Sequence, residues 1–215
     1  MTDDSVIAGI SEKDWESVVA KVAQAAVVVK WVHIVVADGT MGTDVTITDM
    51  SKFADLVADF PQVSFEVHLL SATPEKYIRP LADAGVSRLI AHVESNDPRR
   101  FLEEVKYDEV EIGIAVDGAT EIEEVEPFLE EVDFVVIMSA EAGATGGTFL
   151  PEAVEKVKLI RQNLPDLPIE VVGGITDATV KAVWDVGATR IVSTAFLYQN
   201  PGNMAEAVEA LAPAS

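Results

Sequence analysis

The residues best suited to acid–base chemistry lie in three consecutive apolar segments, which contain all three histidines of the chain. Side chains alternate between the two faces of a β-strand, so residues two apart point the same way. The resulting same-face sets are His33 with Val35 and Ala37, Glu66 with His68 and Leu70, and His92 with Glu94. One histidine in a strand is usually a core residue with satisfied hydrogen bonds, whereas three on neighbouring strands favour a polar site.

Five side chains from these segments and the next one are candidate acids and bases: His33, Glu66, His68, Glu94 and Asp117. Apolar surroundings raise the pKa of a carboxyl group, which would make it a stronger base. The lysines fall outside the inward-facing sets near the carboxyl ends of the strands, and Lys30 lies at the opposite end of its strand. A Schiff-base mechanism is therefore disfavoured, and proton abstraction is preferred.

Three segments of small residues in the last third of the chain suit a phosphate group. They are the loop 143–147, the pair Gly173-Gly174 and the pair Ser193-Thr194. Backbone N–H groups in such turns bind phosphate, and barrels often place a phosphate site after their last strands. Each segment alone is weak evidence, because glycine also serves simple turns. Together they predict phosphate contacts from Gly146, Gly147, Gly173, Gly174, Ser193 and Thr194.

The elements that must position these residues are eight apolar segments, each followed by a helical pattern. We expect strands at Val6–Ile10, Trp31–Asp38, Ser64–Leu70, Arg88–Glu94, Glu111–Asp117, Phe134–Ala140, Ile169–Val172 and Arg190–Ala195. Strict alternation without a linker predicts a single α/β domain over residues 1–215, a (β/α)8 TIM barrel with its chemistry at the carboxyl ends of the strands. An open doubly wound sheet is the alternative, and eight units in so short a chain favour the closed barrel.

Capping residues predict where the helices begin. Ser11 is expected to be the N-cap of the first helix, and Thr73-Pro74 and Asp97-Pro98 are expected to open two others. Further helices are expected from about Glu121 and from about Ala178.

The composition excludes several classes of protein. The chain has 215 residues, no cysteine and a formal net charge of −22. Disulfides and thiolate metal sites are therefore excluded, and a nucleic-acid or anionic-membrane partner is disfavoured by charge repulsion. No apolar run approaches the roughly 18 residues of a membrane helix, and the acidic N-terminus does not resemble a signal peptide. A cytoplasmic protein is expected, with its charge on a solvated helical surface or, alternatively, on a salt-adapted one.

Five short segments, taken in order and at their spacing, resemble a known family. They are WVHIVVADG at 31–39, EVHLL at 66–70, HVE at 92–94, AGATGGTFLPE at 142–152 and VVGGI at 171–175. They are similar to the motifs W-x-H-[IV]-D-x-M-D-G, [DE]-V-H-L-M, H-V-E, P-G-F-G-G-Q-x-F-x-P and V-D-G-G-I of ribulose-phosphate 3-epimerase. The resemblance covers the chain from about Val6 to Asn200.

This resemblance implies inversion at a carbon beside the ketone of D-ribulose 5-phosphate. In the family, a divalent metal polarises the oxygens, two aspartates bind it and exchange the proton, and two histidines complete its shell. The histidines correspond to His33 and His68, but Val35 and Val172 stand where the aspartates belong. Valine can neither bind a metal nor accept a proton, and two imidazoles alone hold a hard cation poorly. We therefore expect the native reaction and the ancestral metal to be lost, with no other cofactor.

Further departures from the family motifs predict a larger and drier pocket. Its expected lining is Gly9, Val35, Ala37, Leu70, Met138, Ala140, Ala144 and Val172. Because the helix faces and caps are intact, the pattern indicates repurposing, by evolution or by a designer, for a bulkier apolar ligand or a proton-abstraction reaction.

Two other functions stay open at this point. One is a catalytically dead family member that binds a phosphorylated ligand or acts as an interaction protein. The other is a residual epimerase with a shifted metal shell that uses Asp38 or Glu94 beside His33 and His68. A small molecule is the expected partner, and the resemblance implies a tendency to form homo-oligomers.

Overall fold

Eight parallel strands form the closed barrel that the alternating pattern predicts. The computed structural model describes residues 4–106, 108–140, 147–199 and 203–213. The strands are β1 (Val6–Ile10), β2 (Trp31–Ala37), β3 (Ser64–Leu70), β4 (Arg88–His92), β5 (Glu111–Val116), β6 (Phe134–Met138), β7 (Ile169–Val172) and β8 (Arg190–Ser193). Each strand pairs in parallel with the next, and β1 pairs with β8. The barrel therefore has no free sheet edge.

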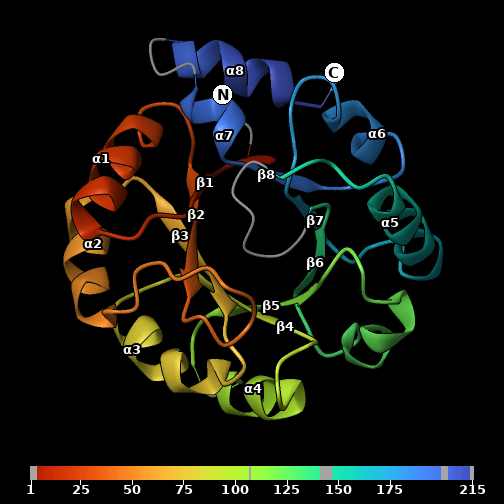
Figure 1. Cartoon of the computed structure of the whole chain (residues 1–215), viewed down its shortest axis with the longest axis horizontal. Coiled ribbons are helices and arrows are strands. Elements are labelled where there is room, and N and C mark those ends of the chain that lie inside the picture. Colours follow the sequence, from red (N-terminus) through yellow and green to blue (C-terminus); the bar gives the residue numbers. More distant parts are fainter. Residues whose placement is uncertain (1–3, 107, 141–146, 200–202, 214–215) are drawn as a thin grey trace.

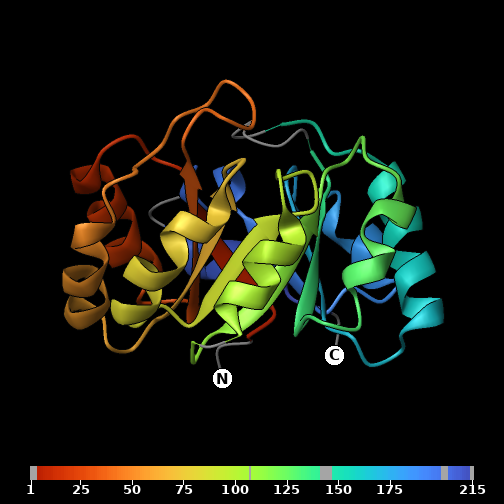
Figure 2. The ribbon, with the colours of Figure 1, turned by 90° about the horizontal axis from the view of Figure 1, so that it is seen from below.

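Helices surround the barrel (Figure 1). The α-helices are α1 (Trp15–Ala25), α2 (Phe53–Asp59), α3 (Ile78–Asp83), α4 (Pro98–Val105), α5 (Glu152–Asn163), α6 (Val180–Trp184), α7 (Ala195–Tyr198) and α8 (Met204–Leu211). Short 3-10 helices are η1 (Met50–Lys52), η2 (Pro74–Tyr77), η3 (Ile122–Glu124) and η4 (Glu126–Phe128). In the side view of Figure 2, the orange loop after β2 rises above the upper end of the barrel, which is the carboxyl end of the strands.

Several predicted boundaries are wrong by one or a few residues. The N-cap of α1 is Asp14, whose carboxylate accepts from the Ser17 N–H, and not Ser11. Thr73 makes no side-chain cap, although Asp97 does cap α4. The helix expected from Glu121 is replaced by η3 and η4, where Pro127 supplies no N–H donor for a continuing helix.

Alternation along the strands separates two apolar clusters. One set of alternate residues packs between the sheet and the helices. The other set points into the barrel and forms a smaller cluster of Ile7, Ile90, Ala115, Phe134, Val136, Met138, Val172 and Val192, with Trp31 against it. His33, Glu66, His68 and His92 are 0–1% exposed and share the strand parity of this inner cluster. No helix in the described part of the chain is long and apolar enough to cross a membrane.

Candidate functional site

A cavity of about 580 Å³ lies at the carboxyl ends of the strands. Of the predicted pocket residues, the structure brings five to its wall: Val35, Leu70, Met138, Ala140 and Val172. Strands β2, β3, β6 and β7, or the turns directly after them, supply these side chains, and Val192 adds another from β8. This part of the wall is apolar, and His68 is the one titratable side chain among the described lining residues.

Two predicted pocket residues lie elsewhere. Gly9 does not line the cavity, because Thr194 and Val192 occupy the space beside it, and an added Cβ would clash with Thr194 Oγ1. The main chain of Ala37 instead anchors the loop after β2, its N–H donating to Thr46 Oγ1 at 2.8 Å. Ala144 lies outside the described residues.

Four of the residues that the sequence predicts to contact phosphate line the glycine-rich side of the cavity: Gly147, Gly173, Gly174 and Thr194. Gly173 and Gly174 have φ angles of 110° and 63°, a region that favours glycine. An added Cβ at Gly174 would lie 2.7 Å from the Phe149 backbone, so glycine permits this close approach. Ser193 is absent from the wall because its buried hydroxyl donates to Ile175 O at 2.9 Å. Gly146 lies outside the described residues.

The three histidines form a continuous hydrogen-bonded chain across β2, β3 and β4. His33 Nε2 lies 3.2 Å from His68 Nδ1, and His68 Nε2 lies 2.8 Å from His92 Nε2. Carboxylates occupy both ends, with His33 Nδ1 at 2.7 Å from Glu66 Oε1 and His92 Nδ1 at 2.9 Å from Glu94 Oε2. All six ring nitrogens are therefore engaged in hydrogen bonds.

A charged cluster lies toward the amino ends of the strands, beneath the histidines. Arg88 Nη1 lies 3.2 Å from Glu66 Oε2, and Arg88 Nε lies 2.7 Å from Glu111 Oε2. Glu170 is 0% exposed, and its Oε1 lies 3.7 Å from His33 Nδ1, too far for a hydrogen bond. Neither Glu170 oxygen has a hydrogen-bond partner within the described structure, nor does Arg190 Nη1.

Sequence reasoning missed Glu170, Arg88 and Arg190. A signal was present, because these residues sit two positions before Val172, Ile90 and Val192, all of which point into the barrel. Strand parity alone would therefore have placed them in the interior. They lie toward the amino ends of their strands, whereas the chemistry of a barrel is expected at the carboxyl ends.

The charges of this cluster set the protonation of its members. Burial disfavours a charged His33, but the carboxylates of Glu170 and Glu66 outweigh burial and raise the pKa of His33 to about 9. Burial, together with the charge of Glu66, raises the pKa of Glu170 to about 7. Burial opposes ionisation of Glu66 as well, yet His33 and Arg88 lower its pKa. Burial and the neighbouring His92 and His33 hold the pKa of His68 well below 6.5.

The expectation that the candidate carboxylates would be strong bases is wrong for Glu66 and Glu94. Burial opposes ionisation of Glu94, but hydrogen bonds from His92, Thr120 and the Asp117 N–H lower its pKa to about 2. Neither Glu94 nor Asp117 lines the cavity. The Asp117 carbonyl accepts from Lys156 Nζ at 2.7 Å, which joins α5 to the end of β5.

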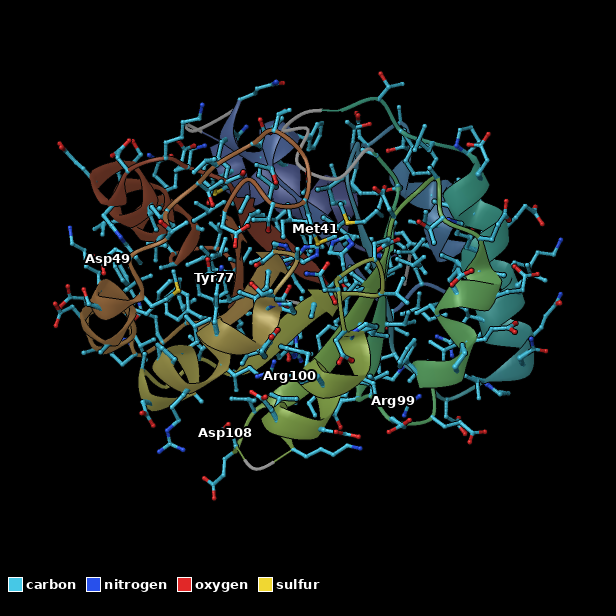
Figure 3. The ribbon with its side chains drawn as sticks, turned by 60° about the horizontal axis from the view of Figure 1, so that its bottom comes forward. Met41, Asp49, Tyr77, Arg99, Arg100 and Asp108 are labelled. Atoms are coloured by element: carbon cyan, nitrogen blue, oxygen red, sulfur yellow. The ribbon has the colours of Figure 1, made fainter. Side chains whose placement is uncertain are left out.

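Asp38 is likewise turned away from the cavity. Its carboxylate accepts hydrogen bonds from the Ser71 hydroxyl at 2.6 Å and from the Tyr77 hydroxyl at 3.1 Å, and it pairs with Lys76 Nζ at 2.8 Å. Tyr77 is labelled in Figure 3. These contacts hold the loop after β2 against η2, so Asp38 belongs to the packing of that loop.

The residues present do not fit the divalent metal that the sequence resemblance implies. Val35 and Val172 offer no ligand atom, and every nitrogen of His33 and His68 already faces another side chain. One deeper set, His33, Glu66 and Glu170, has ligand atoms within 4.8 Å of one another. However, Arg88 and a cationic His33 already balance its carboxylates, so a third positive centre there would be repelled.

Comparison with known proteins adds a family assignment to this geometry. Residues 5–198 match the model of the "Ribulose-phosphate 3 epimerase family". The chain is 33% identical to ribulose-phosphate 3-epimerase of Schizosaccharomyces pombe over 165 residues, which is 76% of this chain and 72% of that protein. It is 31% identical over 185 residues to the cytoplasmic isoform of that enzyme from Oryza sativa subsp. japonica, covering 83% of this chain and 80% of that one.

Solved structures show the same barrel at low sequence identity. A 3-hexulose-6-phosphate synthase superposes with a TM-score of 0.72 at 15% identity, covering 96% of this chain and 97% of that one. A KGPDC from Streptococcus mutans gives a TM-score of 0.73 at 15% identity, covering 96% of this chain and 94% of that one. At such identities the likeness establishes the fold alone.

Proposed function

Given that this chain belongs to the ribulose-phosphate 3-epimerase family, we propose that its cavity binds a phosphorylated small molecule with an apolar body and no longer epimerises D-ribulose 5-phosphate. The composition of the cavity wall carries the proposal. Val35 and Val172 face the cavity at the two positions where the family motifs have aspartate.

The apolar wall favours a ligand whose body is less polar than a sugar. Val35, Leu70, Met138, Val172 and Val192 can pack against carbon atoms but cannot hydrogen-bond to hydroxyl groups. A sugar placed there would leave its hydroxyl groups without partners, which costs binding free energy for each buried group. The cavity volume of about 580 Å³ falls within the range typical of small-molecule sites.

The opposite wall of the cavity favours a ligand that carries a phosphate group. Gly147, Gly173, Gly174 and Thr194 bring main chain to the cavity surface without bulky side chains. Main-chain N–H groups bind phosphate without needing a basic side chain, so the chain's net negative charge is no obstacle. The name of the related enzyme, ribulose-phosphate 3-epimerase, also points to a phosphorylated ligand.

Calorimetry with a matched set of compounds tests the ligand class. Phenyl phosphate, D-ribulose 5-phosphate, inorganic phosphate and phenol would be titrated into the full chain. We expect phenyl phosphate to bind more tightly than D-ribulose 5-phosphate, and phenol not to bind measurably. Ala140→Phe should abolish binding by filling the cavity, whereas Val27→Phe, at a position 80% exposed, should leave it unchanged. Tighter binding of the sugar phosphate than of phenyl phosphate would refute the proposed ligand class.

Epimerase turnover tests the loss of the ancestral reaction. Wild type should convert D-ribulose 5-phosphate at least about 10⁴-fold more slowly than ordinary members, with or without added zinc, manganese or iron(II). The double variant Val35→Asp, Val172→Asp should gain metal-dependent turnover, and each single variant should gain less. Ordinary turnover by wild type would show that other residues have replaced the two aspartates.

A second candidate is a proton-abstraction reaction on an apolar ligand. The observation that favours it is His68, whose ring reaches the cavity wall and whose depressed pKa keeps it neutral. A small-molecule partner, a cytoplasmic location and self-association remain predictions from the sequence.

A further inference from the structure

The four hydrogen bonds along the histidine chain require more protons than three neutral imidazoles can supply. A neutral imidazole has one N–H donor and one acceptor nitrogen, and an ionised carboxylate only accepts. The bonds run from Glu66 to His33, His33 to His68, His68 to His92 and His92 to Glu94. Each bond needs one proton, so four are needed and three neutral rings bring three. The complete chain therefore holds one excess proton.

This excess proton can sit on any of the three rings without breaking a bond. With the charge on His33, both His33 nitrogens donate, His68 carries its proton on Nε2 and His92 on Nδ1. If His33 Nε2 passes its proton to His68 Nδ1, the charge moves to His68. If His68 Nε2 then passes its proton to His92 Nε2, the charge reaches His92. No ring has to rotate, and the total number of protons is unchanged.

Ring geometry suits these transfers. The planes of His68 and His92 are nearly parallel, at 6°, and their Nε2 atoms are 2.8 Å apart while the ring centroids are 4.8 Å apart. The two nitrogens therefore face each other between the rings. His33 and His68 are nearly perpendicular, at 84°, and 3.2 Å apart between their nitrogens. Both distances lie in the normal hydrogen-bond range.

We propose that His33, His68 and His92 act as a proton relay that connects the buried Glu66 to Glu94 at the rim, passing the cavity wall at His68. The side chain of Glu94 is 23% exposed and gives the relay its contact with solvent. The groups that face the relay are Glu66, Glu170 and, behind them, Arg88 and Arg190 at the inner end, and Glu94 at the outer end.

The resting position of the proton follows from these neighbours. Two carboxylates stand beside His33, one beside His92 and none beside His68. The proton therefore rests on His33 and crosses His68 on its way to the rim. This inference goes beyond the proposed ligand and is tested on the protein without ligand, so the two can fail separately.

Nitrogen-15 NMR of histidine side chains in the full chain reads the proton positions directly. At pH 7.5 we expect His33 doubly protonated, His68 protonated on Nε2 and His92 on Nδ1. Together the three rings should then carry four ring protons, one more than three neutral imidazoles hold, as the four hydrogen bonds require. Only three ring protons at pH 7.5, one on each of three neutral rings, would overturn the relay.

A variant that keeps the hydrogen bonds but cannot carry a proton separates a relay from a structural role. In His92→Gln, the amide can accept from His68 and donate to Glu94, but it cannot pass a proton on. We expect solvent exchange of the His33 ring N–H to slow at least tenfold, whereas an unchanged exchange rate would refute the relay. Glu94→Gln, which keeps an acceptor for His92 and removes its charge, provides a second test with the same expected direction. Glu104→Gln, an exposed carboxylate on α4, is the control and should change nothing.

Discussion

The barrel interior has two levels. The lower level is charged but buried, whereas the upper level is mostly apolar although it borders the open cavity. The lower level holds Glu66, Glu170, Arg88 and Arg190, most of them almost fully buried. The upper level borders the open cavity, and its strand residues include Val35, Met138, Val172 and Val192. The ionisable groups of the lower level thus lie where a ligand in the cavity does not reach them, and the histidine chain, which borders the cavity at His68, connects the two levels. Density of charge inside a barrel is therefore a poor guide to where its ligand binds.

Removing one charge from the lower level should have the largest effect on stability. Glu66→Gln leaves His33 and Arg88 without their shared buried partner, and we expect a loss of about 3–5 kcal/mol in the free energy of unfolding. Urea denaturation measures it. Glu111→Gln is the matched control, because it also pairs with Arg88 but is 50% exposed, and it should cost at most about 1 kcal/mol. Equal costs would mean that burial does not distinguish the two pairs.

Neutralising Glu170 should instead increase the free energy of unfolding. The folded pKa of Glu170, about 7, lies above its ordinary value of 4.5, so the folded state holds its proton more tightly and stability falls as the pH rises between these values. Glu170→Gln removes this penalty and should raise the free energy of unfolding at pH 8 by up to about 3 kcal/mol. At pH 4.5 and below, the gain should largely vanish. A variant that is less stable than wild type at pH 8 would show that Arg190 and His33 hold Glu170 ionised.

Adding a charge to the upper level should cost less. Val172→Asp places a carboxylate on an apolar wall that still borders an open cavity, so partial solvation limits the loss to about 1–2 kcal/mol at pH 8. The loss should shrink at pH 4, where the new carboxyl group is protonated. Val172→Asn, measured alongside, should show no such pH dependence. A pH-independent loss in both variants would point to shape and not to charge.

Added salt should change the contribution of surface charges to stability, but not the contribution of the buried charges in the lower level. With a net charge of −22, raising KCl from about 0.1 to 1 M should screen repulsion and raise the melting temperature by a few degrees. Arg99 and Arg100, labelled in Figure 3, lie on the outer surface, where they form ion pairs with Glu131 and Glu104. Salt should remove the small contributions of these ion pairs to stability. The difference between wild type and Glu66→Gln should stay constant with salt, because ions do not enter the interior. Scanning calorimetry at several salt concentrations provides both comparisons.

Much of the fold could be predicted because barrel strands have a simple local signature. Eight apolar segments were enough to place β1 to β8, and β1, β3 and β7 have the predicted bounds. The resemblance to the family motifs also predicted that Val35 and Val172 would share a cavity, as they do. Errors fell at the ends of elements, as at Asp14 and Pro127, where one side-chain contact or one missing N–H decides the outcome.

The sequence by itself determined the barrel, the family and the two valines at the aspartate positions, because each depends on local patterns along the chain. Only the tertiary structure decided what the polar residues do. Glu66 and Glu94 are weak bases because folding places the imidazoles of His33 and His92 against their carboxylates. The histidine chain itself depends on the register that sets β2, β3 and β4 side by side, which fixes distances that no single segment contains.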